Sequence, residues 1–145
     1  MRSDTISVLN EIFSEFPFLM GGEVSNEEIL EASGAIEFEF PSDYVEFVRR
    51  YGGAMVGPYP VFGLRAGEPM GVDDRSVVEV TRRCRQQGVP GSHNWLIISR
   101  DHSGNPIGLG RDGSVLTWDH DFRQTMKLAD SFEQYLRKEC LKLSD

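Results

Sequence analysis

Apolar and polar positions follow a helical period in the first third of the chain. In residues 4–16 the apolar side chains recur three and four residues apart, which predicts a helix that ends at Pro17. A second helix is predicted to begin at Ser25, because Glu28 stands three residues later in the pattern of a capping box. We expect Gly34 to end this helix, since glycine readily takes the left-handed conformation that closes helices.

The period then changes twice within a few residues. Residues 36–40 alternate between apolar and acidic side chains, which is typical of an extended segment with one buried face. After Pro41 the helical period returns and predicts a third helix, with Ser42 as its N-cap and Gly52 at its end. The apolar stripe that we expect in the core consists of Tyr44, Phe47, Val48 and Tyr51.

Short strands dominate the prediction for the second half of the chain. Residues 56–64 are rich in glycine, proline and aromatic residues and predict a loop that leads into a short strand. Further strands are predicted at 95–99, 107–110 and 114–118, the last two joined by a tight turn at Asp112-Gly113. Strands that follow one another through tight turns imply an antiparallel meander.

Two more helices complete the prediction. One is expected over residues 76–87, with Ser76 as its cap, and the other over residues 128–143, with Asp130 as its cap and Glu133 as the capping partner. Helices followed by consecutive strands indicate an α+β fold. We find no repeat or long linker, so residues 1–145 are predicted to form one domain.

Charge is distributed unevenly in this chain, whose formal net charge is −8. Residues 1–46 hold eleven acidic residues and one basic residue, whereas residues 47–145 hold twelve acidic and fourteen basic residues. A negative field disfavours nucleic acid, whose phosphates need a basic surface. The same field favours a basic protein partner and speeds its encounter at low salt. The alternative interpretation is a solvated face that keeps the protein soluble.

Targeting and redox signals favour a cytoplasmic protein. No apolar run approaches the roughly 20 residues that cross a bilayer, and the N-terminal residues lack the pattern of a secretory signal. Cys84 and Cys140 stand far apart without metal-ligand spacing, so we expect free thiols in a reducing compartment. We therefore predict no membrane partner and no cofactor.

One polar cluster raises the possibility of chemistry. It consists of Asp101, His102, Asp119, His120 and Asp121, which follow two neighbouring strands and contain residue types that bind divalent metals. However, no metal-binding, nucleophile or phosphate-loop motif frames it, and polar residues at strand ends commonly bond to nearby backbone amides instead. We predict no catalytic residue and no metal site, and keep a metal-dependent enzyme using His102, Asp119 and His120 as an alternative.

Three segments together resemble the SUKH superfamily, in particular its Smi/Knr branch of cell-wall-assembly regulator-like proteins. They are FPSDYVEFVRRYGGA at residues 40–54, ISRDHSGNPIGLGRDGSVLTWDHD at residues 98–121 and SFEQYL at residues 131–136. Two positions depart from the family pattern, since Phe40 replaces the usual Leu and Gly52 stands where Asn is common.

This resemblance implies an α+β fold with helices packed around a curved, mostly antiparallel sheet. It also implies a binding function, because many bacterial members are immunity proteins that neutralise polymorphic or contact-dependent toxins, whereas fungal members act as regulatory scaffolds. The family has no agreed catalytic residues. The shared positions Pro41, Gly53, Gly104, Gly113 and Trp118 are expected to determine the fold.

The sequence therefore predicts a protein-binding domain. Its first hypothesis is immunity to a cognate toxin, such as a nuclease, and its alternative is a toxin-independent regulatory scaffold. The predicted contact residues combine acids of the N-terminal third with aromatic anchors and their acidic neighbours. They are Glu37, Glu39, Asp43, Tyr59, Trp118, Asp119 and Asp121. Trp118 has a second interpretation as a simple core residue.

Overall fold

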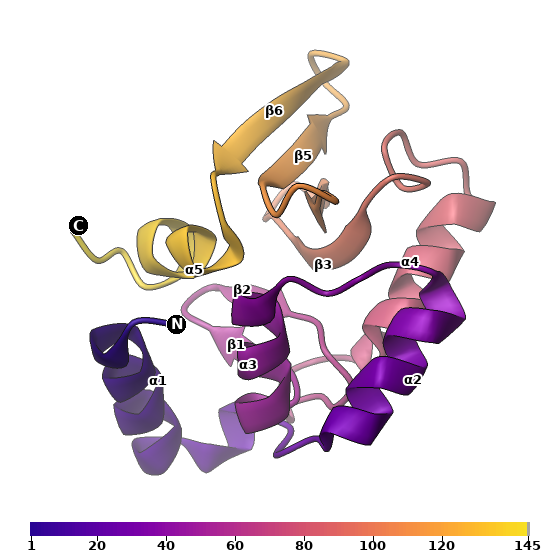
Figure 1. The fold of residues 1–145 in the computed structure, drawn as a ribbon. Helices are drawn as coiled ribbons and strands as arrows, with labels where there is room; N and C mark the ends of the chain where they lie inside the picture. The colour runs from indigo at the N-terminus through magenta and orange to yellow at the C-terminus, as the bar shows by residue number, and fades with distance from the viewer. Residues whose placement is uncertain (145) are drawn as a thin grey trace.

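The computed structural model describes residues 1–144. Its α-helices are α1 (Ser3–Glu15), α2 (Asn26–Ile36), α3 (Ser42–Tyr51), α4 (Val77–Gln86) and α5 (Phe132–Tyr135), and its shorter helical segments are η1 (Pro17–Leu19), η2 (Val72–Asp74) and the π-helix η3 (Leu136–Cys140). Its strands are β1 (Ala54–Val56), β2 (Tyr59–Val61), β3 (Leu96–Arg100), β4 (Pro106–Leu109), β5 (Val115–Asp119) and β6 (Gln124–Ala129). Figure 1 shows the helices packed around the sheet, from which the β5–β6 hairpin projects.

The strands form one sheet in which each strand pairs with the next along the chain. All the pairs are antiparallel, in the order β1-β2-β3-β4-β5-β6. The predicted antiparallel meander and the predicted α+β fold are therefore confirmed. The predicted turn between β4 and β5 is confirmed as well, with Gly113 at φ 91°.

Two strands, β1 and β6, were not predicted. Most of β1 lies before residues 56–64, for which the sequence predicts a loop that leads into a strand, and it pairs with β2 across a turn in which Gly57 has φ 59°. In β6 the first four residues are all exposed, so they show no alternation of apolar and polar positions. Pairing with β5 holds β6 in place. The prediction that the last helix begins at residue 128 was therefore wrong.

The start of α2 confirms the predicted cap, but its end lies beyond the predicted position. Ser25 Oγ accepts a hydrogen bond from the Glu28 amide at 3.2 Å. The helix continues through Gly34 and ends where Glu37 takes the left-handed conformation, with φ 54°. The amides of Glu37 and Phe38 bond to the carbonyls of Gly34 and Ser33, which is the Schellman arrangement. Glycine is thus not the residue that closes this helix.

The segment between α2 and α3 shows the predicted burial without forming a strand. Phe38 and Phe40 are buried and the glutamates beside them are exposed, but residues 37–41 pair with no strand. The N-cap of α3 is Pro41, and Ser42 lies inside the helix and makes no capping bond, so that prediction was wrong. The helix ends at Gly52 as predicted, with φ 80°.

The caps of the later helices differ from the prediction in detail. Ser76 is the N-cap of α4, as predicted, but its side chain makes no capping hydrogen bond. At α5 the cap is Ser131, whose Oγ accepts from the Gln134 amide at 3.1 Å, while Gln134 Oε1 accepts from the Asp130 amide at 2.6 Å. The observed cap lies one residue later than the predicted pair of Asp130 and Glu133, and Gln134 bonds to the amide before the N-cap instead of closing a capping box.

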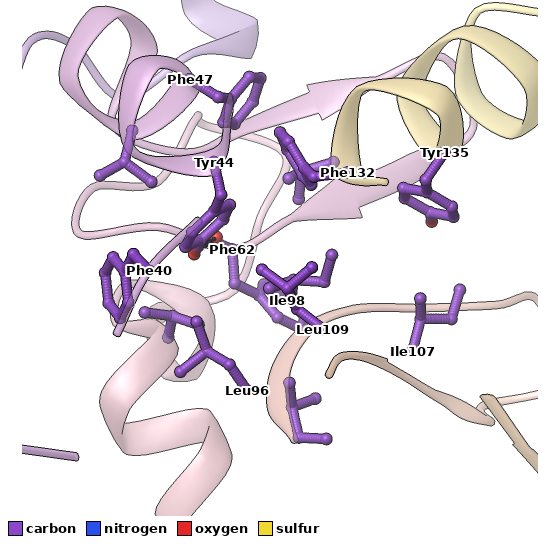
Figure 2. Packing of buried hydrophobic residues seen from close by; sticks show 14 of the residues in the cluster. Phe40, Tyr44, Phe47, Phe62, Leu96, Ile98, Ile107, Leu109, Phe132 and Tyr135 are labelled. Atoms are coloured by element: carbon purple, nitrogen blue, oxygen red, sulfur yellow. Dashed lines mark hydrogen bonds between the residues drawn. The ribbon is translucent and has the colours of Figure 1, made fainter. Parts of the chain in front are cut away.

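The core forms where α3 and α5 meet the sheet, as Figure 2 shows. The Tyr44 ring packs edge-on against Phe40 and Phe132, at centroid distances of 5.2 and 5.1 Å. Its hydroxyl donates to the Phe62 carbonyl at 2.6 Å, so the polar atom of this buried side chain is satisfied. The helical stripe predicted for the core, which includes Tyr44, is confirmed as buried.

Candidate functional site

One end of the sheet brings together predicted contact residues from two strands and the β5–β6 turn. Tyr59 begins β2, Trp118 and Asp119 end β5, and antiparallel pairing places these positions at the same end as the loop between β3 and β4. We call this surface the aromatic end of the sheet. It comprises Tyr59, His102, Trp118, Asp119, Asp121 and Phe122.

The turn between β5 and β6 is ordered by one carboxylate. Asp119 Oδ1 accepts hydrogen bonds from the backbone amides of Asp121 at 2.9 Å and Phe122 at 3.2 Å. Arg123 then takes a left-handed conformation, with φ 53°, and the chain returns as β6. These two bonds fix the backbone from which the Phe122 side chain extends.

Phe122 is the most exposed of the large apolar side chains described, at 75%. Its neighbour Asp121 is also exposed, and His120 Nε2 lies 3.8 Å from Asp121 Oδ1. Trp118 is only partly buried and pairs across the hairpin with Thr125. The tip of the hairpin therefore presents an aromatic ring surrounded by charged groups, away from α1–α4 (Figure 1).

The loop between β3 and β4 supports the other side of this surface. Tyr59 and His102 lie with ring centroids 5.0 Å apart and planes inclined by 36°. Asp101 instead serves the loop itself, because its Oδ1 accepts from the amides of Ser103 and Asn105, each at 2.9 Å. The interpretation of this aspartate as a backbone-bonding residue is thus confirmed.

The alternative of a metal centre finds no ligand set here. Within residues 1–144, no three His, Cys, Asp or Glu side chains gather in an arrangement that could hold a metal ion. His102 packs on Tyr59, and the Asp119 carboxylate bonds to the backbone of its own turn. The metal-dependent enzyme that used His102, Asp119 and His120 is not supported by this geometry.

The acidic contact residues lie elsewhere. Glu39 shares an open pocket with Asp112 of the β4–β5 turn, and the Arg111 guanidinium in that turn donates to the Glu37 carbonyl at 3.2 Å. This turn is at the opposite end of the strands from Trp118. Strands of four or five residues separate the two ends by about 15 Å. The structure thus divides the predicted contact residues into two groups.

Asp43 differs from the two glutamates in that it has a structural role. Its Oδ1 accepts from the Tyr44 amide at 2.9 Å, and its Oδ2 accepts from the Glu133 amide at 3.0 Å. The second bond joins the first turn of α3 to the first turn of α5. A carboxylate held in this way is less free to contact a partner than Glu37 or Glu39, which are exposed.

Most of the acidic excess of residues 1–46 remains unpaired. Asp4, Glu28 and Glu46 form ion pairs with arginines. The acids of this region that are exposed and joined by no ion pair to another residue within 1–144 are Glu11, Glu15, Glu23, Glu27, Glu31, Glu37 and Glu39. Their charge therefore acts on the surroundings of the protein.

The two cysteines are free thiols, as predicted. Cys140 is buried, and burial raises the pKa of its thiol from 9.0 to about 12. Cys84 is partly buried, and burial raises the pKa of its thiol as well. A raised pKa keeps a thiol protonated and makes it a poor nucleophile at neutral pH.

Phe122 is the main residue of this surface that the sequence did not predict. Because the sequence did not predict β6, it did not place Phe122 in a hairpin turn. Two features in the sequence could have suggested it, namely the Asp-His-Asp run before a bulky aromatic residue and the threonine that follows at position 125.

No helix among residues 1–144 is both long and apolar enough to cross a membrane.

Comparison with known proteins gives one family. Residues 6–141 match the model of the family described as SMI1-KNR4 cell-wall, SUKH_5. No curated protein matches the chain. The matched region extends from α1 to the end of η3 and so includes both ends of the sheet.

Proposed function

The chain belongs to the SMI1-KNR4 family, and we propose that it is a cytoplasmic immunity protein that neutralises a bacterial toxin by binding it directly. This family is generally non-catalytic, and we extend that property to this chain. The observation that carries the proposal is the exposed Phe122 ring, held at the tip of the β5–β6 hairpin beside Asp121. Large aromatic side chains surrounded by polar groups are common at the centres of protein interfaces.

The proposed contact uses the aromatic end of the sheet. Phe122 and Trp118 would supply apolar anchors, while Asp119 and Asp121 would meet basic groups at the rim. The two backbone bonds to Asp119 Oδ1 support this role, since they order the turn before a partner arrives. A pre-ordered turn loses less conformational entropy on binding. Covering the active surface of the toxin would block access of its substrate.

The charge of the chain supports a basic partner. The unpaired acids of residues 1–46 produce a negative field that attracts a positively charged domain, such as a toxin that acts on nucleic acid. Long-range attraction of this kind raises the association rate, and salt weakens it. Glu37 and Glu39 would attract the partner at long range without contacting it, because they lie at the other end of the sheet from Phe122.

The first experiment uses the whole chain as bait in its native cell, with captured proteins identified by mass spectrometry. We expect one toxic protein whose toxicity is abolished when the chain is co-expressed. The Phe122→Ala variant should bind this toxin at least about tenfold more weakly and protect poorly. Leu30→Ala is the matched control, because Leu30 is 72% exposed but lies on α2.

Two outcomes would contradict different parts of the proposal. Full protection by folded Phe122→Ala would show that the aromatic end is not the contact surface. Capture of several proteins, none of them toxic, would instead reject immunity. It would favour a regulatory scaffold, the function suggested by the cell-wall description of the matched family.

A further inference from the structure

A small pocket lies between α4 and the sheet, apart from the turn that carries Phe122. Its volume is ≈ 190 Å³, and its apolar lining includes Phe62, Val80, Val89, Ile97 and Pro106. Ligand pockets for drug-sized molecules are commonly about 300 to 1,000 Å³. The size and the lining of this pocket therefore suit the apolar part of a small molecule.

The polar lining of this pocket is basic. It includes Arg83, Gln87 and Arg100, and none of the lining residues found within 1–144 is acidic. This is unexpected in a chain with 23 acidic and 15 basic residues. Arg100 pairs with the Asp74 carboxylate outside the lining, whereas Arg83 forms no ion pair within residues 1–144, so a ligand anion would supply the charge that balances Arg83.

Both guanidinium groups are positioned by η2 and yet keep donors for a ligand. Arg100 Nη2 forms an ion pair with the buried carboxylate of Asp74, and its guanidinium lies 5.1 Å above the Phe62 ring. Arg83 Nη2 donates to the Asp73 carbonyl at 3.3 Å. Each of these hydrogen bonds uses one nitrogen of a group that has five N–H donors.

The half-buried thiol of Cys84 lies in the same lining, and its pKa depends on the charged groups around it. Burial raises the pKa of this thiol, whereas Arg83 and Arg100 act in the opposite direction. Both guanidinium groups are thus close enough to favour a negative charge beside Cys84. A ligand anion in the pocket would experience the same attraction.

We propose that this pocket binds a small monocarboxylate, whose carboxylate pairs with Arg83 and Arg100 and whose apolar part packs against Val80 and Ile97. The guanidinium fork matches the two oxygens of a carboxylate. The walls of the pocket match a short apolar group, as in an aromatic or branched aliphatic acid. This binding is independent of the contact proposed at the aromatic end of the sheet.

The test is a titration of the ¹⁵N-labelled protein with benzoate, followed by NMR. Benzamide, which has the same shape without the charge, and inorganic phosphate are titrated in parallel at constant ionic strength. We expect saturable shifts with benzoate at residues of α4 and β3, and binding of benzamide at least about tenfold weaker. Equal binding of benzamide, absence of saturation with benzoate, or tighter binding of phosphate would each overturn the carboxylate assignment.

Two variants and one labelling reaction locate the site. Arg83→Gln should weaken benzoate binding about tenfold. Arg82→Gln should not, because Arg82 lies outside the lining and donates to the Ala35 carbonyl of α2. Benzoate should also slow alkylation of Cys84, with buried Cys140 as the internal reference. Equal effects of the two arginine variants, or unchanged alkylation of Cys84 at saturating benzoate, would show that benzoate does not bind in this pocket.

Discussion

Arg137 Nη1 donates a hydrogen bond to Thr5 Oγ1 at 2.8 Å and so joins η3 to α1 across 132 positions of the chain. The Arg137 side chain is 5% exposed, and Thr5 is fully buried. The same nitrogen lies 3.2 Å from Asp4 Oδ2. The first and last helical segments are therefore held together by a buried guanidinium group as well as by apolar contacts.

Removing this guanidinium group should destabilise the whole domain. In Arg137→Met the aliphatic stem remains, but the buried hydroxyl of Thr5 loses its donor, and Asp4 loses its ion pair with Arg137 while keeping the one with Arg2. We expect the free energy of unfolding in urea to fall by about 2 kcal/mol. Lys138→Met is the control, because Lys138 is exposed. A loss no larger than that of the control would show that the contact contributes little.

The left-handed residue at the end of α2 predicts a stabilising substitution. Glu37 has φ 54°, a conformation that costs a residue with a side chain free energy but suits glycine. Glu37→Gly should therefore raise the free energy of unfolding by about 0.5 kcal/mol. Glu39→Gly, at a position without positive φ, should lower it. Destabilisation by Glu37→Gly would show that side-chain contacts of Glu37 outweigh the backbone strain.

The helices and the core were predictable because each rests on a local pattern. Ser25 with Glu28 gave the start of α2, and the stripe from Tyr44 to Tyr51 gave the buried face of α3. The end of α2 was not predictable from the glycine, because Gly34 stays helical while Glu37 takes the left-handed position. That choice follows from tertiary packing, which buries Phe38.

The candidate site was predicted only in part, for a related reason. Trp118 and Asp119 are the last residues of β5, a recognisable strand, so both were expected near its end. Phe122 lies in a turn whose second strand, β6, has four exposed residues and no amphipathic pattern. Such a strand exists because β5 offers it hydrogen-bonding partners, which is information that the segment itself does not contain.

Alkaline pH should reduce stability through the buried thiol of Cys140. Its pKa is raised from 9.0 to about 12 by burial, so the folded protein holds a proton that the unfolded chain releases above pH 9. The stabilisation is complete below about pH 9 and is lost as the pH rises towards about 12. Urea unfolding between about pH 8 and 10.5 should show this decline.

Substituting each cysteine in turn separates the contribution of the Cys140 thiol to the pH dependence of stability from the contributions of other groups. In Cys140→Ala the free energy of unfolding should depend less steeply on pH than in the wild type, whatever its absolute value. Cys84→Ala should change the slope less, because Cys84 is only partly buried. Identical slopes in wild type and Cys140→Ala would assign the alkaline loss to other groups, such as Tyr135, whose pKa is raised by burial.

Neutralising two exposed glutamates should slow the encounter with a basic toxin without changing the contact itself. Glu37→Gln with Glu39→Gln removes two charges that are not ion-paired within residues 1–144. We expect a lower association rate, a weaker dependence of that rate on salt and a nearly constant dissociation rate, measured by stopped flow. Glu11→Gln with Glu15→Gln is the matched pair on α1. If both pairs slow association equally, the field of the whole acidic third steers the partner. A higher dissociation rate in the first pair alone would instead place Glu37 or Glu39 within the contact.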